Sequence, residues 1–484
     1  TLARWSIYGF YREIRVIGEE NVPKEGPLIV CSTHCNMIVD PAVLASTFPH
    51  KRKLHFWAKN SLFGNKYFNV VLHSGGVVPV DRTSKNNKAL FASTNEVLKL
   101  GEVVAVFPEG TSHSKSRLLE LKDGASWAAL QYASEYVANY KRIERWSFLA
   151  NYSKIDQGVN SKNDHLKKSN NTTNNKKSIQ QVIISPCAIT YLQKSKYRSL
   201  VIVTYGPPIY VEAYLKDFSG GERAAVKQLT NRIEVELEKL SINAADWDIL
   251  NSANMARKLL FADDKRVHLE EYVKITQHLI YFFTNTTSEE AVLLKKSLND
   301  YKTKLDMLSL SNSDIARYET RSLTIPWALY QFLFELSRFL IQLPFFLPGL
   351  CFHWPIYLMG KISAKYEIYE ESRAQNKIIL GLAWLILSYS ALFFCIWFFF
   401  FYTLLGLIFA AGSVFTFAWY HIALVDSNKG NPNRDEVEKL VTKRHSCIDQ
   451  LKSITREYRA KSDDLRIVLE YCERDYDQYY SISM

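Results

Sequence analysis

The hydrophobic pattern of the chain includes one very long apolar stretch near its end. Residues Ile378 to Val425 contain no Asp, Glu, Lys or Arg. A continuous helix of that length would span roughly 70 Å, whereas the hydrocarbon core of a membrane is about 30 Å thick. The pattern therefore predicts a two-helix transmembrane hairpin over 378–425, with its turn near Tyr402 to Gly406. A pair of buried soluble helices is the alternative, and the density of aromatic side chains disfavours it.

Basic residues lie on both sides of this stretch. Those before it are Lys361, Lys365, Arg373 and Lys377, and those after it are Lys429, Arg434 and Lys439. A hairpin returns both of its ends to one face of the membrane, and cytoplasmic segments carry an excess of Lys and Arg. We therefore expect both flanking segments to lie in the cytosol.

A second apolar region, at 321–360, is less regular. It is interrupted by Pro326, Pro344, Pro348 and Pro355 and by the charged residues Glu335 and Arg338. Proline breaks or kinks a helix, and charges are costly in the hydrocarbon core. This pattern predicts interfacial or membrane helices and leaves the number of crossings open.

The first 215 residues show short apolar runs that alternate with helix-like stretches. The runs are Gly26–Cys31, Val77–Val80, Val103–Phe107, Val182–Ile184 and Leu200–Val203, and the helix-like stretches are Pro41–Phe48, Lys88–Leu100 and Gly124–Tyr140. Strands that alternate with helices predict an α/β domain over 1–215, with a mixed sheet flanked by helices. Residues 153–181 are rich in Asn, Lys and Ser, so we expect a disordered insertion there.

Two further segments have helical patterns. Residues 216–320 contain amphipathic stretches, such as Ala224–Leu240 and Leu269–Phe283, and predict a helical region. Residues 433–480 predict a cytosolic helical tail, in which apolar residues recur at roughly heptad spacing. This spacing fits either a helical partner or docking on the chain's own helical region.

The charge and the cysteines narrow the class of protein. The net charge of +11 and the isoelectric point near 9.0 favour an anionic partner such as nucleic acid, phospholipid or a phosphorylated substrate. No nucleic-acid-binding motif occurs, so we do not expect nucleic acid. The seven cysteines are scattered and odd in number, which indicates a reducing compartment or the bilayer rather than a disulfide framework.

A histidine and a carboxylate follow the first apolar run. His34 comes three residues after Cys31, and Asp40 lies six positions later. A neutral imidazole can take a proton from an attacking hydroxyl, and a carboxylate on its other nitrogen fixes the tautomer and stabilises the imidazolium. We therefore predict His34 and Asp40 as a catalytic pair. The alternatives are a structural histidine and a helix-capping Asp40 before Pro41.

A second polar motif follows the run Val103–Phe107. It comprises Glu109, Gly110, Thr111 and Ser112, with Lys122 further along. The ends of strands in α/β sheets are common ligand positions, and glycine lets the backbone approach a ligand closely. Arg82, just after Val77–Val80, is a third element, because an arginine can bind phosphate through two parallel N–H donors. A polar turn and an ordinary surface arginine are the alternatives.

Together these elements resemble the glycerolipid acyltransferase family, of the glycerol-3-phosphate and lysophosphatidate acyltransferase type. In chain order the matching motifs are His34 with Asp40, Gly75–Arg82, Phe107–Ser114 and Val182–Cys187. The resemblance covers about residues 1 to 215 and is greatest to fungal glycerol-3-phosphate/dihydroxyacetone-phosphate sn-1 acyltransferases. It departs in one respect, since five residues separate His34 from Asp40, where the family usually has four.

The resemblance implies an enzyme that transfers a fatty acyl group from acyl-CoA to the sn-1 hydroxyl of glycerol 3-phosphate, and also to dihydroxyacetone phosphate. The product would be lysophosphatidate, in the first step of glycerolipid synthesis. His34 would act as the base and Asp40 would orient it. The residues implied to hold the glycerol phosphate are Arg82, Glu109, Gly110, Thr111, Ser112 and, more weakly, Lys122.

The same resemblance implies no cofactor and no metal, with acyl-CoA as a co-substrate. It implies a multi-pass protein of the endoplasmic reticulum membrane, with the catalytic domain facing the cytosol and the lipid bilayer as a partner. Homo-oligomerisation is left open.

Other functions fit the same features. The first is a lysophosphatidate or lysophospholipid acyltransferase, which differs only in its acceptor. The second is a catalytically inert membrane scaffold, which the five-residue spacing favours and the intact second motif disfavours. A lipid transporter ranks last, because the apolar stretch lacks charged residues.

Overall fold

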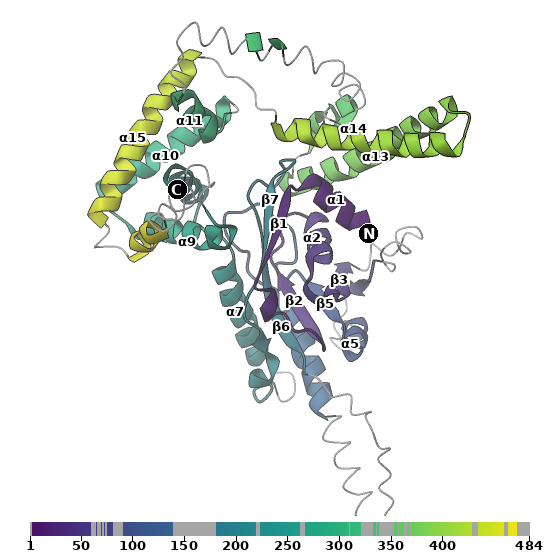
Figure 1. Cartoon of the computed structure of the whole chain (residues 1–484). Helices are drawn as coiled ribbons and strands as arrows, with labels where there is room; N and C mark the ends of the chain where they lie inside the picture. Colours follow the sequence, from purple (N-terminus) through teal and green to yellow (C-terminus); the bar gives the residue numbers. More distant parts are fainter. Residues whose placement is uncertain are drawn as a thin grey trace, which may run out of the picture.

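The computed structural model describes most of the chain. The described residues are 2–59, 75–80, 91–138, 181–218, 223–261, 267–308, 310–320, 369–427, 434–458 and 463–471, with short pieces within 60–74 and 333–367. They form a sheet with helices on both faces, a bundle of helices beside it, and a helical hairpin that projects from one end (Figure 1). The predicted insertion at 153–181 lies outside the described residues, apart from Gln181.

Among the described residues, eight strands form one mixed sheet in the order β1-β7-β6-β2-β5-β3-β4, with β8 paired to β6. The strands are β1 Glu13–Ile17, β2 Leu28–Ser32, β3 Leu54–Lys59, β4 Val77–Val80, β5 Val103–Val106, β6 Ile183–Tyr191, β7 Leu200–Tyr205 and β8 Ile209–Tyr210. Those from β6 to β4 in this order are parallel, whereas β7 and β8 run antiparallel to β6. The predicted mixed sheet is confirmed.

The central strands are buried on both faces, which is why they appear as continuous apolar runs. In β2, Ile29 and Cys31 face one layer of helices, while Leu28 and Val30 face the other. The first layer contains α5 (Ala92–Lys99), a helix at 124–138 and α7 (Arg223–Leu240), and the second contains α1 (Leu2–Phe10) and α2 (Val39–Thr47). The sheet is therefore the middle layer of three.

Several predicted boundaries differ from the structure. Strand β6 continues to Tyr191, beyond the predicted end at Ile184, because Pro186 is accommodated within the strand. Strands β1 and β3 were not predicted. Helix α7 packs on the sheet through Leu229 and Ile233, so the sheet and its helices extend beyond the predicted boundary at residue 215.

The helical bundle is built from α8 (Trp247–Leu260), α9 (Leu269–Asn285), α10 (Glu289–Met307), α11 (Asn312–Thr320) and α15 (Arg434–Tyr458). Helix α15 packs against α8, α10 and α11 (Figure 1), and its Leu440, Cys447 and Leu451 are buried in the same core. Lys443 also forms an ion pair with Asp300 of α10 at 3.1 Å. Of the two interpretations of the heptad spacing, the structure shows docking on the chain's own helices.

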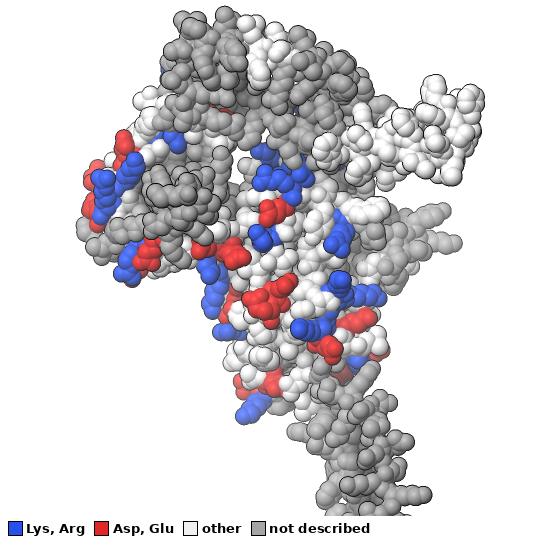
Figure 2. Space-filling view, viewed as in Figure 1, with Lys and Arg blue, Asp and Glu red and all other residues white. Residues whose placement is uncertain are grey.

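The long apolar stretch forms two antiparallel helices, α13 (Glu370–Phe399) and α14 (Leu404–Ser427). They are joined by a tight turn at 400–403, slightly earlier than predicted, in which Phe401 and Tyr402 have positive φ. The projecting end belongs to the stretch without charged residues and is uniformly white in Figure 2. Within the described residues, the span Ser372–Phe399 is long and apolar enough to cross a membrane, and Leu404–Trp419 is a shorter apolar helix. The helical hairpin is thus present, and its insertion into a membrane stays a prediction.

Candidate active site

Three parallel strand ends bring the predicted motifs together. Strand β2 pairs with β5 on one side and with β6 on the other, in parallel in both cases. The carboxyl ends of parallel neighbours lie at the same edge of a sheet. His34 follows β2 and Glu109 follows β5, while Tyr191 ends β6. Residues far apart in sequence therefore meet at one edge.

His34 and Asp40 are in direct contact. The Nδ1 atom of His34 lies 2.9 Å from Oδ2 of Asp40. The Asp40 side chain is fully buried, whereas that of His34 is 16% exposed. Because a carboxylate accepts hydrogen bonds, Nδ1 carries the proton and Nε2 is the nitrogen with a free lone pair. The imidazole is thus held in the tautomer that a general base requires.

The buried Asp40 carboxylate is surrounded by donors. Its Oδ2 also accepts the backbone N–H groups of Cys35 at 2.8 Å and Asn36 at 2.7 Å, and its Oδ1 accepts the hydroxyl of Tyr191 at 2.6 Å. Burial and the neighbouring Asp40 raise the pKa of Tyr191 well above its ordinary value, so this hydroxyl remains a donor. Within the described residues, the charge of Asp40 is therefore compensated by these hydrogen bonds.

The additional residue between His34 and Asp40 is absorbed by a turn. The carbonyl of Asn36 accepts the N–H groups of both Val39 and Asp40, and Met37 has a positive φ of 26°. Helix α2 begins at Val39, one residue before Asp40, and Asp40 accepts from residues that precede the helix. The interpretation of Asp40 as a helix cap before Pro41 is therefore wrong.

Glu109 ties the two motifs to each other. Its Oε1 accepts the backbone N–H of His34 at 2.7 Å, and its Oε2 accepts the N–H of Leu119 at 3.1 Å and is in contact with Nε2 of His113. The Glu109 side chain is 1% exposed. Both oxygens are thus used within the chain, and the geometry makes Glu109 an organiser of the loop that holds His34.

The ring of Phe107 forms one wall of the site. It stacks on the imidazole of His34 with centroids 4.2 Å apart and an angle of 22° between the planes. The ring of Phe56 lies parallel behind it, at 6.4 Å. An aromatic face on the imidazole restricts its rotation and keeps water away from that side. The wall therefore supports a fixed orientation of His34.

The other predicted site residues lie around this centre. Gly110 has a φ of +77°, which a larger residue rarely adopts, and a Cβ there would lie 3.4 Å from Cγ of Lys122. Thr111 and Lys122 are exposed and Ser112 is half-buried. The structure thus brings all of them to the loop after β5. Arg82 lies outside the described residues; β4, which precedes it, ends at the same edge of the sheet.

Sequence reasoning missed three residues at this edge. Tyr191 bonds Asp40, His113 contacts Glu109, and Lys194 donates through Nζ to the carbonyl of His113 at 3.4 Å and to Oγ of Ser114 at 3.2 Å. His113 had a local signal, since it lies within the second motif, four residues after Glu109. Tyr191 and Lys194 have none, because they reach the site only through the pairing of β6 with β2.

A thiol also lies beside the base. Burial raises the pKa of Cys35 well above its ordinary value, and the charge of Asp40 raises it further. Since the thiolate is the nucleophilic form of cysteine, Cys35 is unsuited to attack a thioester. The arrangement therefore favours His34 acting as a base over Cys35 acting as a nucleophile.

The start of α13 packs against the loop that carries the pair. The hydroxyl of Ser372 donates to Sδ of Met37 at 2.9 Å, and the side-chain oxygen of Gln375 accepts the N–H of Ile38 at 3.4 Å. Ala374 lies between these contacts and is fully buried in the core of the sheet domain. The N-terminal end of the apolar hairpin is therefore fixed next to the turn that follows His34.

Two parts of the chain match known families. Residues 13–138 match the Acyltransferase family, and residues 253–378 match the Glycerol-3-phosphate acyltransferase 2 C-terminal domain. The second match extends over most of the helical bundle and into α13.

Curated relatives show the same similarity. The chain is 23% identical over 435 residues to Glycerol-3-phosphate O-acyltransferase 2 of Saccharomyces cerevisiae, over 76% of this chain and 58% of the relative. It is 30% identical over 112 residues to a 1-acyl-sn-glycerol-3-phosphate acyltransferase of Bacillus subtilis, over 23% of this chain and 54% of the relative. The chain therefore spans less than two thirds of either relative.

Among solved structures, the chain is similar to the 1-acyl-sn-glycerophosphate acyltransferase of Thermotoga maritima. The similarity covers 49% of this chain and 76% of that one, with 17% identity and a TM-score of 0.31.

Proposed function

Because the chain belongs to the glycerolipid acyltransferase family, we propose that it transfers a fatty acyl group from acyl-CoA to the sn-1 hydroxyl of glycerol 3-phosphate. Lysophosphatidate and free CoA are the products, and dihydroxyacetone phosphate is a second acceptor. The hydrogen bond between His34 and Asp40, which leaves Nε2 free, carries the proposal of acyl transfer. The match of 253–378 to the glycerol-3-phosphate acyltransferase 2 domain supports the choice of acceptor.

In the proposed mechanism, Nε2 of His34 accepts the proton of the sn-1 hydroxyl as the oxygen attacks the thioester carbonyl. Asp40 stabilises the imidazolium that forms. When the tetrahedral intermediate collapses, the carbon–sulfur bond breaks and the thiolate of CoA takes the proton from Nε2. His34 returns to its starting state, and no covalent enzyme intermediate is needed.

Several basic groups support a phosphate site near the base. Lys194 donates only to a carbonyl and a hydroxyl among the described residues, so its charge is available to an anion. Lys122 lies against Gly110 in the same loop. We expect these two residues, with Arg82, to position the phosphate of the acceptor, and Thr111 and Ser112 to contact its hydroxyl groups. Glu109 acts by holding the loop of His34.

The second candidate is acylation of 1-acyl-sn-glycerol 3-phosphate at its sn-2 hydroxyl. The similarity to the relative from Bacillus subtilis favours it, since this is the activity in that relative's name and the matched part reaches 30% identity. The two functions share the base and differ only in whether the acceptor already carries an acyl chain.

One assay separates the candidates. Purified full chain in neutral detergent receives labelled acyl-CoA with glycerol 3-phosphate, dihydroxyacetone phosphate or lysophosphatidate, and the products are resolved by chromatography. We expect lysophosphatidate from glycerol 3-phosphate and little phosphatidate. The reverse preference would support the second candidate. Transfer that persists in a folded His34→Ala variant would refute the mechanism for both.

We further propose that the enzyme is a multi-pass protein of the endoplasmic reticulum membrane with its catalytic domain in the cytosol. The N-terminal end of α13 packs on the sheet domain, and α15 packs on the helical bundle. Both ends of a membrane-inserted hairpin must therefore lie on the same side of the membrane as these two parts. In intact microsomes, protease should therefore reach both the sheet domain and α15. Protection of either one would contradict this topology.

A further inference from the structure

The N-terminal end of α13 carries two basic side chains that form no ion pair within the described residues. Arg373 and Lys377 lie four residues apart on the helix and therefore share a face, where they interact electrostatically. Both side chains are half-buried. Lys377 donates through Nζ to the carbonyl of Ser195 at 3.0 Å, which is an uncharged partner. Two like charges are thus held close together in a partly desolvated place.

The guanidinium of Arg373 has an unused donor. Its Nε is shielded from solvent and has no hydrogen-bond partner in the described part of the chain. Buried polar groups in proteins are almost always paired. The nearby carboxylate of Glu367 accepts from Asn376 at 2.7 Å and from the N–H of Tyr369 at 3.2 Å, so its described contacts are with neutral donors. The cation pair therefore has the properties of an anion site.

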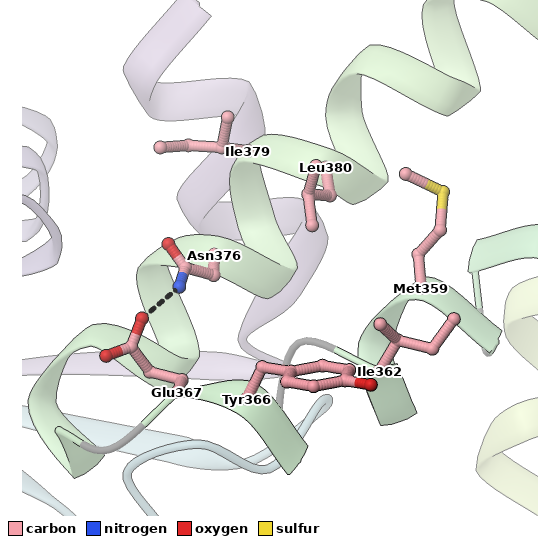
Figure 3. A pocket seen from close by; sticks show the side chains of 7 residues that line it. All are labelled: Met359, Ile362, Tyr366, Glu367, Asn376, Ile379 and Leu380. Carbon is pink, nitrogen blue, oxygen red and sulfur yellow. Dashed lines mark hydrogen bonds between the residues drawn. The ribbon is translucent and has the colours of Figure 1, made fainter.

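An apolar groove lies along the N-terminal part of α13 (Figure 3). It has a volume of about 460 Å³ and is lined by Met359, Ile362, Tyr366, Glu367, Asn376, Ile379 and Leu380. In Figure 3 the hydrogen bond between Glu367 and Asn376 lies at one end, and Met359 and Ile362 lie at the other. Apart from that polar end and the hydroxyl of Tyr366, the walls are apolar, which suits an alkyl chain.

Helical spacing connects the cation pair to the groove. Asn376 is three residues after Arg373, and Leu380 is three residues after Lys377. Residues three and four apart are neighbours on a helix surface. The two cations therefore lie beside the start of the groove, and the groove continues at Ile379 and Leu380 into the apolar stretch that is expected in the membrane. This order of charge and hydrocarbon matches that of a phospholipid, whose phosphate lies above its acyl chains.

We propose that the N-terminal end of α13 is a binding site for a lipid with a phosphate headgroup. Arg373 and Lys377 bind the phosphate, and the groove holds an acyl chain. A free phosphate ester would contact the two cations but leave the groove empty, and a neutral lipid would fill the groove but leave the cations without an anion. The proposed site involves different side chains from those assigned to the acceptor, and its occupation can be measured without an acyl donor. It therefore stands or falls independently of the proposed reaction.

The location of the site bears on catalysis. Ser372 precedes Arg373 and bonds Met37, and Gln375 bonds the N–H of Ile38. Both contacted residues belong to the turn between His34 and Asp40. A lipid that fixes this part of α13 therefore also fixes the turn that positions the base.

The test is a binding measurement with short-chain lipids. Purified full chain in neutral detergent is titrated with dioctanoyl phosphatidate, dioctanoyl phosphatidylcholine or glycerol 3-phosphate, and the thermal unfolding midpoint is followed. The variant Arg373→Gln/Lys377→Gln removes both charges and keeps helix-forming residues. The matched control is Lys361→Gln/Lys365→Gln, which removes two exposed charges, also four residues apart, from the segment before the hairpin. Leu380→Trp fills the groove.

We expect phosphatidate to stabilise the wild type and the control variant alike. Its affinity should fall at least tenfold in the Arg373/Lys377 variant and also in Leu380→Trp, while phosphatidylcholine should bind more weakly throughout. Equal affinity of phosphatidate for the wild type and the Arg373/Lys377 variant would overturn the proposal. An equal effect of that variant on glycerol 3-phosphate, with none from Leu380→Trp, would overturn it in favour of a site for free phosphate esters. The midpoints without ligand show whether each variant is folded.

Discussion

Replacement of Asp40 by Asn tests the central arrangement, because the structure allows the charge to be removed with little change in geometry. The Oδ2 atom accepts three N–H groups, from His34, Cys35 and Asn36, whereas Oδ1 faces only the hydroxyl of Tyr191. An asparagine oxygen in the place of Oδ2 keeps those three bonds. Its NH₂ group then faces the hydroxyl of Tyr191, which can accept as well as donate. The tautomer of His34 is preserved in this variant.

The expected loss is therefore the stabilisation of the imidazolium by the carboxylate. Unit charges about 4 Å apart attract each other by about 4 kcal/mol at an effective dielectric constant of about 20. If the charge is fully developed in the transition state, kcat should fall about a thousandfold. The KM values for both substrates should stay within about twofold, because Asp40 is fully buried and does not reach the substrates.

The assay is steady-state acyl transfer by the purified wild type and Asp40→Asn, with their unfolding curves measured alongside. Asp40→Ala is the contrasting variant, because it leaves three buried N–H groups and a hydroxyl without an acceptor and should also destabilise the fold. A loss of less than tenfold in a folded Asp40→Asn variant would refute the role of the charge, and with it the catalytic pair.

Three further outcomes are expected. Tyr191→Phe removes one charge-assisted hydrogen bond, of about 1.5–3 kcal/mol, from Asp40; kcat should fall about tenfold with unchanged KM values in the same assay. Backbone N–H groups donate to both oxygens of Glu109. In Glu109→Gln the NH₂ group would face one of these donors and leave it without an acceptor, so urea denaturation should show a loss of about 1–3 kcal/mol of stability. Burial raises the pKa of the Cys31 and Cys187 thiols to about 12, so they stay protonated where the unfolded chain ionises. Stability should be insensitive to them below about pH 8 and fall between about pH 9 and 12, by up to about 1.4 kcal/mol per pH unit for each thiol. Urea denaturation at pH 8 and pH 10 measures this fall, which should be smaller in Cys31→Ala.

Local patterns were sufficient to locate the central strands and the loops that follow them. Strands β2 and β5 are buried on both faces, so nothing polar interrupts them, and the polar residues begin where the strands end. Strand β3 was missed for the opposite reason. It contains His55, which is buried but is paired with Glu102, and a buried polar pair hides an apolar run from a pattern that reads each residue alone.

The supporting residues of the site depend on contacts that no local pattern contains. Tyr191 reaches Asp40 across 151 positions of sequence, through a strand whose length was underestimated at Pro186. The contacts of Ser372 and Gln375 with the turn after His34 join residues more than 330 positions apart. A helix that looks like a membrane span in sequence also supports the catalytic loop, and only tertiary packing reveals this second role.

The packing of α13 also gives a physical reason for the longer spacing between His34 and Asp40. The turn directs Met37 and Ile38 outward, and they are 37% and 59% exposed. Both nevertheless contact the N-terminal end of α13. A shorter loop could still join β2 to α2, but it would lose one of these two contact residues. If α13 enters the membrane as proposed, this loop fixes His34 next to the bilayer surface, where an acyl-CoA chain and its product partition. The additional residue then couples the catalytic base, His34, to the membrane helix. It does not weaken the pair of His34 and Asp40, because Oδ2 of Asp40 still lies 2.9 Å from Nδ1 of His34.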